Sequence, residues 1–253
     1  MKLIATLITV AFIVAGCATI QPAPDAKPPE TQPIDAWARV LERFVDDRGY
    51  VDFYGLQRDR ADLDRYVAWV YDVGPNNRPG LFPSYDDKLA YHINAYNALA
   101  MWKILKAGIP EELGPWARFS FFWRDRVEVG GKRMSLYAYE NEVIRRLNEP
   151  RIHFGLNCMA RGCPRLPREP FRAETLDAQI EREARQFFSE QRNLRVNHRE
   201  GKTYTSAILN WFEEDFLAHA PSLIAYINRY APQPVPNDYP LEFIPYDWRV
   251  AHQ

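Results

Sequence analysis

An excess of charge of one sign is what this sequence lacks most clearly. It has 32 basic and 33 acidic residues, for a net charge of −1. Proteins that bind nucleic acids normally carry a basic stripe or patch, so we expect no nucleic-acid partner. The sequence also lacks a glycine-rich phosphate loop and a Gly-x-Ser-x-Gly segment. Neither a nucleotide-binding loop nor a serine nucleophile elbow is therefore predicted.

Cysteine is scarce, with three residues among 253, and the first of them ends an N-terminal signal-like segment. Lys2 precedes an apolar run, Leu3 to Val14, that is too short to span a bilayer. The run ends in Val14-Ala15-Gly16-Cys17, which resembles the signal of a bacterial lipoprotein, whose cysteine is lipidated. An ordinary signal peptide with a chance cysteine is the alternative.

The lipoprotein resemblance implies a location. Two or more acyl chains attach a protein stably to a membrane. The lipid on Cys17 would therefore anchor this protein to the membrane. Ala18 follows Cys17, and no aspartate is present there to signal retention at the inner membrane. We therefore expect a protein anchored to the outer membrane and facing the periplasm, where disulfides form.

Composition divides the chain into three parts. Residues 1–16 are the expected signal peptide, and residues 17–33 contain five prolines and form the expected extended tether. Residues 34–253 show no second hydrophobic unit behind a linker, so we expect one domain there. The chain is 47% hydrophobic and 26% charged, which is ordinary for a globular protein with a substantial core.

Hydrophobic periodicity predicts helices mixed with short strands. Helical spacing is found near residues 35–45, 63–71, 84–107, 136–147, 175–190, 206–219 and 221–230. Strand signals are found at 120–136 (turning at Gly130-Gly131), 151–156, 194–196, 202–205 and 241–248. The pattern predicts an α+β domain whose central helix, 84–107, is buried and packs on a small, largely antiparallel sheet.

The central helix carries polar residues that burial would leave in need of partners. His92, Asn94 and Asn97 all lie within its apolar surroundings. Asn94 and Asn97 could bind polar groups of a substrate or supply an oxyanion contact. Bridging backbone groups inside the fold is the equally open alternative.

The stretch from Arg151 to Pro164 holds most of the candidate chemistry, because His153, Asn157, Cys158 and Cys163 lie within it. Cys158 is a candidate nucleophile if a neighbouring imidazole or cation lowers the pKa of its thiol. A Cys158–Cys163 disulfide closing a tight loop is the main alternative, and two inert thiols are the third.

His153 is the nearest candidate base, although it has a geometric difficulty. On a continuous strand, residues 153 and 158 point to opposite faces. They meet only if the chain bends near Asn157, unless His92 supplies the base instead. Glu140, on the preceding helix, could orient His153 or act as an acid.

The buried polar groups should satisfy one another, since each costs on the order of 1–3 kcal/mol when left unpaired. We therefore expect one shared cleft to bring together a set of residues from three segments: Asn94, Asn97, Glu140, His153 and Cys158. His92 and Asn157 are further candidates for substrate binding there.

A zinc site is a weaker possibility. Cys158, Cys163, His153 and His92 could in principle supply four ligands. The spacing of the cysteines, Cys-x4-Cys, lies at the wide edge of the usual range, and no second cysteine pair is present. We expect no metal and no other cofactor.

Three blocks of sequence resemble the DUF547 family, a family of unknown function. They are Tyr91–Ala98, His153–Cys158 together with Cys163-Pro164, and Tyr246–Trp248. Gly49–Phe53 and Trp211–Phe216 also fit. The family usually continues its Tyr-Asp-Trp with Ser/Thr-Leu-Asn, whereas Arg249-Val250-Ala251 follows here, so any role of that tail asparagine is in doubt.

A weaker resemblance links the helix from Asn94 to Ile109 with the central helix of transglutaminase-like and papain-like cysteine enzymes. In those enzymes a cysteine begins the helix, and a histidine follows on a later strand. Here Asn94, or a residue close to it, takes the cysteine's position. If the fold is shared, the chemistry has been moved or lost.

Two functional hypotheses follow. The first is a periplasmic cysteine-dependent hydrolase or acyl transferase acting on peptide-like substrates, with Cys158 as nucleophile and His153 as base. The second is a non-catalytic module that binds a small ligand or a protein, with a pocket stapled by a Cys158–Cys163 disulfide.

Overall fold

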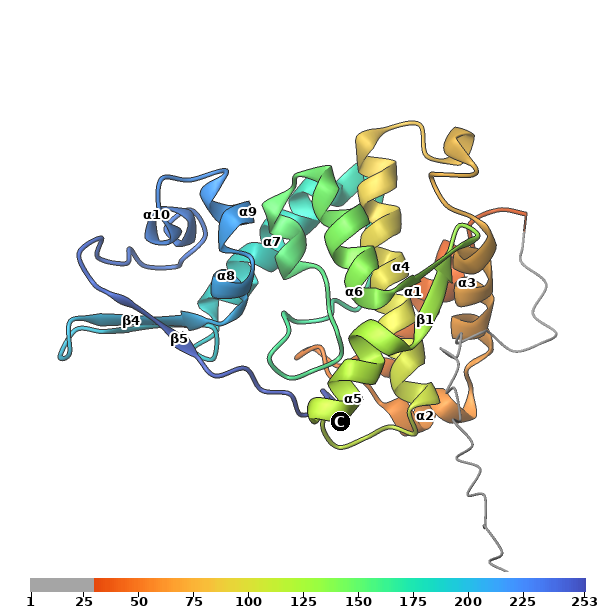
Figure 1. The fold of residues 1–253 in the computed structure, drawn as a ribbon, viewed down its shortest axis with the longest axis horizontal. Coiled ribbons are helices and arrows are strands. Elements are labelled where there is room, and N and C mark those ends of the chain that lie inside the picture. The colour runs from red at the N-terminus through yellow and green to blue at the C-terminus, as the bar shows by residue number, and fades with distance from the viewer. Residues whose placement is uncertain (1–29) are drawn as a thin grey trace, which may run out of the picture.

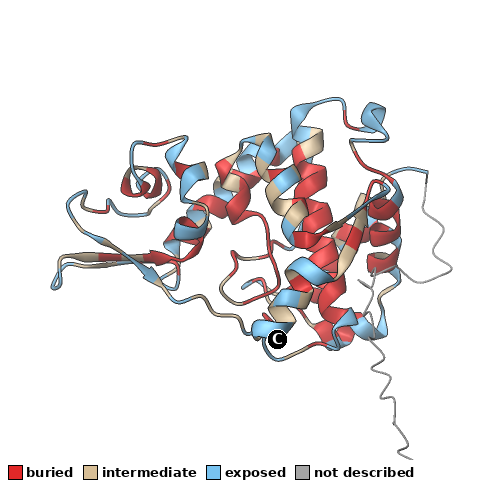
Figure 2. Ribbon diagram, viewed as in Figure 1, coloured by how far each residue is buried: buried red, intermediate tan, exposed pale blue. Residues whose placement is uncertain are grey.

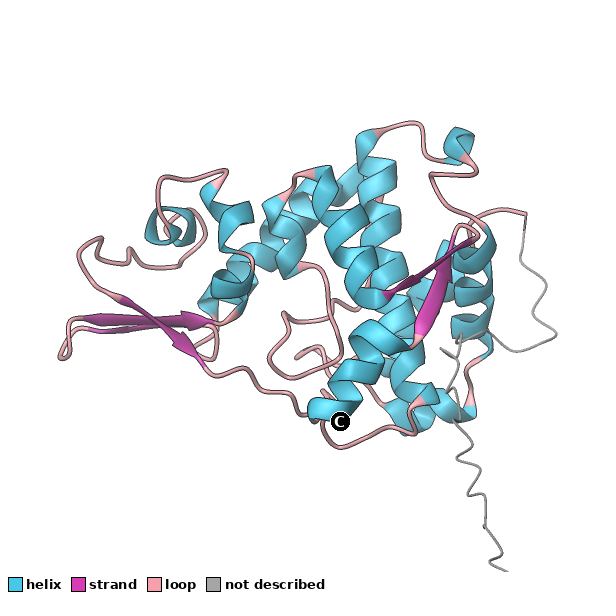
Figure 3. Cartoon of the chain, viewed as in Figure 1, coloured by secondary structure: helices cyan, strands magenta, loops and turns pink. Residues whose placement is uncertain are grey.

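The computed structural model describes residues 30–253. The expected signal peptide, the lipidation site Cys17 and most of the proline-rich segment lie outside the described residues. Within the described part, helices predominate and the strands form two small sheets, so the α+β class is confirmed (Figures 1 and 3).

The helices and strands follow one another without a regular alternation. The α-helices are α1 (Ile34–Phe44), α2 (Phe53–Arg58), α3 (Ala61–Asp72), α4 (Tyr85–Lys106), α5 (Pro115–Phe119), α6 (Leu136–Ala138), α7 (Leu176–Ser189), α8 (Ile208–Trp211), α9 (Glu213–Leu217) and α10 (Leu223–Ile227). Short 3-10 or π turns are η1 (Pro79–Leu81), η2 (Ser120–Arg124), η3 (Tyr139–Ile144), η4 (Arg145–Leu147), η5 (Pro150–Phe154) and η6 (Ala173–Thr175). The strands are β1 (Arg126–Val129), β2 (Lys132–Ser135), β3 (Leu194–Asn197), β4 (Lys202–Ser206) and β5 (Leu241–Ile244).

The central helix α4 begins and ends where local chemistry requires. Ser84 accepts a hydrogen bond from the backbone of Asp87, and the Asp87 side chain accepts one from the backbone of Ser84, which forms a capping box. Gly108, at a φ of 79°, allows the chain to turn away after the last helical residue. From Leu89 to Leu105 the helix is buried along its whole length, as its red colour in Figure 2 shows.

Helix α4 packs mainly against other helices, namely α3, η3 and η6. This arrangement differs from the expected packing on a sheet. A helix that is buried on all sides needs neighbours all round it, and α3, η3 and η6 supply much of this cover.

The two sheets are small and largely antiparallel. Strands β1 and β2 form a hairpin in which Val129 faces Lys132 across the turn at Gly130-Gly131. The second sheet has the order β3-β4-β5, with β3 antiparallel and β5 parallel to β4. In Figure 1 this sheet lies at the opposite end of the molecule from α3.

The strand predicted at residues 151–156 is wrong, because the segment forms the 3-10 turn η5 instead. Pro150 occupies its first position, and the Glu149 side chain accepts a hydrogen bond from the backbone N–H of Arg151. Both features favour a helical turn over an extended chain. The apolar residues Ile152 and Phe154 are still buried, as the hydrophobic pattern required.

Buried apolar side chains form two clusters. The larger one is built on α1, α3 and α4, and the smaller one on α7 to α10 around Phe154. Tyr246 packs against both. Among residues 30–253, no helix is both long enough and apolar enough to cross a membrane.

Candidate functional site

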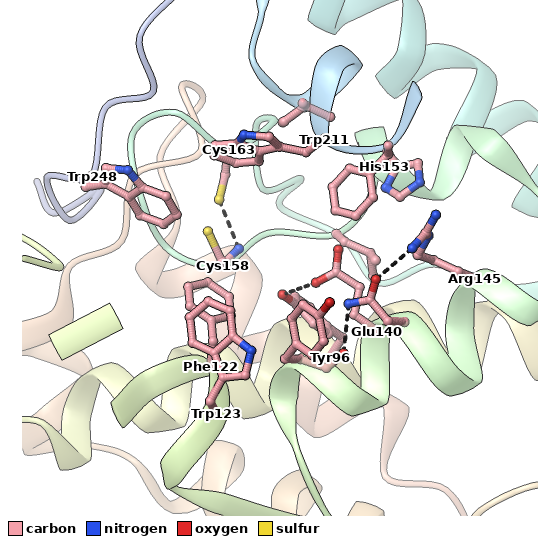
Figure 4. A pocket seen from close by; sticks show the side chains of 15 residues that line it. Tyr96, Phe122, Trp123, Glu140, Arg145, His153, Cys158, Cys163, Trp211 and Trp248 are labelled. Atoms are coloured by element: carbon pink, nitrogen blue, oxygen red, sulfur yellow. Dashed lines mark hydrogen bonds between the residues drawn. The ribbon is translucent and has the colours of Figure 1, made fainter. Parts of the chain in front are cut away.

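A cavity of about 390 Å³ opens where the two hydrophobic clusters meet (Figure 4). Its walls are mostly aromatic, and its polar groups include two thiols, a carboxyl, an imidazole and a guanidinium. The lining residues are Tyr96, Phe122, Trp123, Tyr137, Glu140, Asn141, Arg145, His153, Leu156, Cys158, Cys163, Ile208, Trp211, Phe212 and Trp248. A concave, largely apolar pocket with a few convergent polar groups is typical of a ligand site.

The two thiols lie together on the loop that follows η5. Both are free and buried, and the backbone N–H of Cys158 donates a hydrogen bond to Cys163 Sγ at 3.0 Å. The disulfide that the sequence allowed is therefore not formed in this structure. Gly162 is required in this loop, because a Cβ there would lie 2.8 Å from the ring of Tyr246.

Asn157 shapes the thiol loop from inside. Its side-chain nitrogen donates to the carbonyl of Pro164 at 2.7 Å, and its side-chain oxygen accepts from the backbone N–H of Met159 at 2.6 Å. Met159 has a φ of 68°, a left-handed conformation that few residues other than glycine adopt. Asn157 thus fixes the bend of the chain at Met159.

Tyr246, in the C-terminal segment, contacts the sulfur atoms of both cysteines. Its hydroxyl donates to Cys163 Sγ at 3.0 Å, and its oxygen lies 3.4 Å from Cys158 Sγ. The pKa of Cys158 is raised well above its ordinary value, because its protonated thiol bonds to Cys163 and because it is buried. Burial also acts to raise the pKa of Cys163, but the hydrogen bonds it receives from Cys158 and Tyr246 outweigh this and lower it.

Glu140 comes from η3 and faces the same cavity. Tyr96 of α4 donates a hydrogen bond to Glu140 Oε2 at 2.8 Å. Burial raises the pKa of Glu140 to about 7, although the hydrogen bond from Tyr96 and the charge of Arg145 oppose the shift. A carboxyl group with such a pKa can both give and take a proton near neutral pH.

His153 is held by Asp215 of α9, at the other end of the cavity from the thiols in Figure 4. Its Nε2 lies 2.7 Å from Asp215 Oδ2, and its ring stacks on Phe212 with a centroid distance of 4.0 Å. Burial lowers the pKa of His153, so the ring is neutral at neutral pH. Because a carboxylate can only accept, Nε2 carries the proton. No hydrogen bond joins His153 to Cys158, Cys163 or Glu140 within residues 30–253.

Arg145 completes this group. Its Nε and Nη2 donate to the two oxygens of Asp215 at 2.7 and 2.8 Å. Burial acts to raise the pKa of Asp215, but the hydrogen bonds from His153 and Arg145 hold it well below its usual range. Asp215 is therefore an anion. It accepts two hydrogen bonds from Arg145 and one from the neutral ring of His153.

The expected shared cleft includes Glu140, His153 and Cys158, but neither of the two asparagines. Asn94 Oδ1 accepts from Trp37 at 3.2 Å and from the backbone N–H of Phe171 at 3.0 Å. Asn97 donates to the carbonyl of Gly155 at 2.9 Å and accepts from the backbone of Asn157 at 2.7 Å. Both asparagines are almost fully buried and form hydrogen bonds with backbone groups. This is the alternative to substrate binding, namely bridging backbone groups inside the fold.

His92 also lies away from the cavity. Its Nδ1 is 2.8 Å from the hydroxyl of Tyr139, and burial lowers its pKa to about 4. The described residues contain no group of three or more His, Cys, Asp or Glu side chains placed to hold a metal ion.

Sequence reasoning missed three important groups, Arg145, Asp215 and Tyr246. Asp215 and Tyr246 lie 62 and 83 residues from the side chains that they contact in the thiol and histidine region. Asp215 and Tyr246 belong to two blocks that resemble the family, Trp211–Phe216 and Tyr246–Trp248. This resemblance was the sequence signal that could have identified them as site residues.

The family model described as "Protein of unknown function, DUF547" matches residues 82–188. Residues 82–188 are therefore similar to DUF547. The matched region includes α4, Glu140, His153 and both thiols of the site, whereas Asp215 and Tyr246 come from beyond it. No curated protein matches the chain, and no solved structure does. The weaker likeness to transglutaminase-like and papain-like enzymes stays a prediction.

Proposed function

We propose that this domain is a cysteine-dependent hydrolase or acyl transferase of peptide-like substrates, with Cys163 as its nucleophile. The observation that supports this most is the hydrogen bonding of Cys163 Sγ. It accepts from the backbone N–H of Cys158 and from the Tyr246 hydroxyl, each at 3.0 Å, in the wall of an aromatic cavity. Hydrogen bonds to a thiolate favour the charged form, and the thiolate is the form that attacks.

The choice of Cys163 replaces the sequence-based choice of Cys158. The raised pKa of Cys158 keeps that thiol protonated, so it serves as a hydrogen-bond donor to its neighbour. His153 also changes role in this proposal, because within residues 30–253 its ring is hydrogen-bonded to Asp215 and not to either sulfur. Glu140 is then the better candidate for proton transfer, since its pKa lies near 7.

The proposed reaction has two steps. The Cys163 thiolate attacks the acyl carbon, a thioester forms, and the leaving amine or alcohol takes its proton from Glu140. Water or an acceptor amine then attacks the thioester, Glu140 takes the proton from that nucleophile, and the thiolate is released. The aromatic walls would bury an apolar side chain of the substrate.

The test is acylation of the protein by activated esters such as p-nitrophenyl acyl esters, followed by peptide mass spectrometry. We expect the acyl group on Cys163 and a loss of turnover of at least about 100-fold in Cys163→Ser, on the scale of losing a nucleophile. Cys158→Ser should keep an acylated Cys163 and lose less. Turnover that persists in Cys163→Ser, with no acyl-cysteine in the wild type, would overturn the proposal.

A non-catalytic binding module is the second candidate. It is favoured by one observation, namely that no imidazole within residues 30–253 is hydrogen-bonded to either sulfur. In that case the cavity would bind a ligand without turnover, and Cys163→Ser would leave the affinity unchanged.

We also propose that the domain is anchored to the outer membrane on the periplasmic side, through lipid on Cys17. The sequence Val14-Ala15-Gly16-Cys17 and the proline-rich tether after it support this. Cys17→Ser should move the protein from the membrane fraction to a soluble or unprocessed form, with Cys163→Ser as the control for loss of a cysteine. A Cys17→Ser protein that stays with the membrane at unchanged mobility would contradict it.

A further inference from the structure

A second cavity, of about 490 Å³, lies next to the thiols but is separate from the aromatic one. Its lining includes four arginines, Arg161, Arg192, Arg195 and Arg249, and we name it the arginine pocket. Tyr246 also lines it, while the Tyr246 hydroxyl contacts the two sulfurs of the first cavity. In a chain with a net charge of −1, four arginines around one cavity are a local concentration of positive charge.

Two of these arginines are neutralised by carboxylates. Arg249 binds Asp247 through Nε at 2.9 Å and Nη2 at 2.5 Å. Arg192 pairs with Glu190 at 2.6 Å, and its Nη1 also donates to the carbonyl of Cys163 at 3.0 Å. These two side chains therefore hold the walls of the pocket in place.

The other two arginines have no such partner. Neither Arg161 nor Arg195 forms a salt bridge with a carboxylate of residues 30–253. The Arg161 guanidinium lies 5.4 Å from the ring centroid of Tyr50, and the Arg195 guanidinium lies 5.2 Å from that of Tyr204. In addition, Arg161 Nε is buried and has no hydrogen-bond partner among the described residues. A buried donor without a partner is costly, and a ligand that accepts from it removes that cost.

We propose that the arginine pocket binds a small oxyanion, a phosphate or carboxylate group, between Arg161 and Arg195. Guanidinium groups match the geometry of both oxyanions and bind them through paired hydrogen bonds. Asp247 and Glu190 neutralise only two of the four arginines. The positive charge of the other two favours an anionic ligand over a neutral one. Anion binding here would not depend on the proposed thiol chemistry, because Arg161 and Arg195 line this pocket and not the cavity that holds Cys158 and Cys163.

The experiment is isothermal titration calorimetry of the full-length chain at low ionic strength, with inorganic phosphate in one arm and citrate in the other. We expect saturable binding of at least one of them, with a dissociation constant on the order of 1 mM or tighter. The arm that binds more tightly identifies the class of oxyanion. Arg161→Gln and Arg195→Gln should each weaken that binding about tenfold or more.

Arg199→Gln is the matched control, because Arg199 is exposed on the turn between β3 and β4 and does not line the pocket. It removes the same charge and should leave the affinity within about twofold. Arg195 is itself exposed, so its variant should fold even if Arg161→Gln does not. Absence of saturable binding in both arms, or an equal loss in Arg199→Gln and Arg195→Gln, would overturn the proposal.

Discussion

The hydroxyl of Tyr246 donates a hydrogen bond to Cys163 Sγ at 3.0 Å, across 83 residues of sequence. Together with the hydrogen bond from Cys158, this contact from the C-terminal segment lowers the pKa of a thiol inside the matched family region. The donor favours the thiolate of Cys163, while Cys158 remains protonated beside it. Two cysteines on one loop thereby acquire opposite chemical characters.

We expect Tyr246→Phe to raise the pKa of the Cys163 thiol, because the variant keeps the ring and removes only the donor. Since Cys163 has a lowered pKa in the wild type, its thiolate persists at lower pH than that of an ordinary thiol of pKa about 8.5. In the variant, the rate of alkylation by iodoacetamide at pH 7 should fall about three- to tenfold. The rate should be measured from pH 5 to 10, with labelling assigned by peptide mass spectrometry.

Tyr204→Phe is the control for this change, because Tyr204 binds the exposed Glu200 and lies away from the thiols. Its profile should coincide with that of the wild type. If Tyr246→Phe leaves the pH profile of Cys163 in place, the hydroxyl does not set the pKa of that thiol.

Asp215→Asn should destabilise the fold. The variant leaves Arg145 without its bidentate carboxylate and gives His153 Nε2 a weaker acceptor. For a partly exposed group we expect a loss of about 2 kcal/mol in the free energy of unfolding, measured with urea at pH 7.

The difference should also depend on pH, with a definite sign. The folded-state pKa of Asp215 is depressed, so its contribution is fully present above the unfolded value of about 3.9 and is lost as the pH falls below it. Wild type and variant should therefore converge in strong acid. Glu214→Gln, an exposed neighbour on α9, should show no comparable loss; a similar loss there would point to charge alone.

Local chemistry made much of the fold predictable. The capping box at Ser84 and the positive φ of Gly108 determine where α4 begins and ends, and both are readable from short segments. The hairpin around Gly130-Gly131 follows from its turn residues. In each case the residues that decide the structure are close neighbours in the chain.

The strand predicted around His153 failed because apolar alternation over six residues does not distinguish a strand from a buried helical turn. Pro150 and the Glu149 cap decided in favour of the turn. The candidate site was predictable only in part, since Glu140, His153 and Cys158 do line one cavity. The partner of His153 and the donor to Cys163 come from distant segments, and no local pattern specifies such contacts.

Glu140→Gln should stabilise the protein at alkaline pH. The folded-state pKa of Glu140 is raised to about 7, above the unfolded value of about 4.3. Its stabilising effect is therefore complete below pH 4.3 and is lost as the pH rises through 7. Because Glu140 keeps part of its surface exposed to the cavity, we expect a gain of about 1–2 kcal/mol at pH 8 and almost none at pH 4.

Urea denaturation at the two pH values measures this difference. Glu142→Gln, on the exposed side of η3, is the matched control and should be neutral at both. If Glu140→Gln is equally stable at pH 4 and pH 8 relative to wild type, the carboxyl is already ionised near its ordinary pKa.

Asn97→Ala should destabilise the fold and loosen the thiol loop at the same time. The Asn97 amide joins the carbonyl of Gly155 to the backbone N–H of Asn157, and the side chain is almost fully buried. Its removal leaves both backbone groups without a partner, which should cost about 2–4 kcal/mol in the free energy of unfolding at neutral pH. Because Asn157 holds the loop that carries both cysteines, alkylation of Cys158 should also become faster in the native state. Asn210→Ala, at an exposed position on α8, should change neither quantity. A variant that loses stability while Cys158 stays as protected as in the wild type would show that Asn97 supports the core but not the loop.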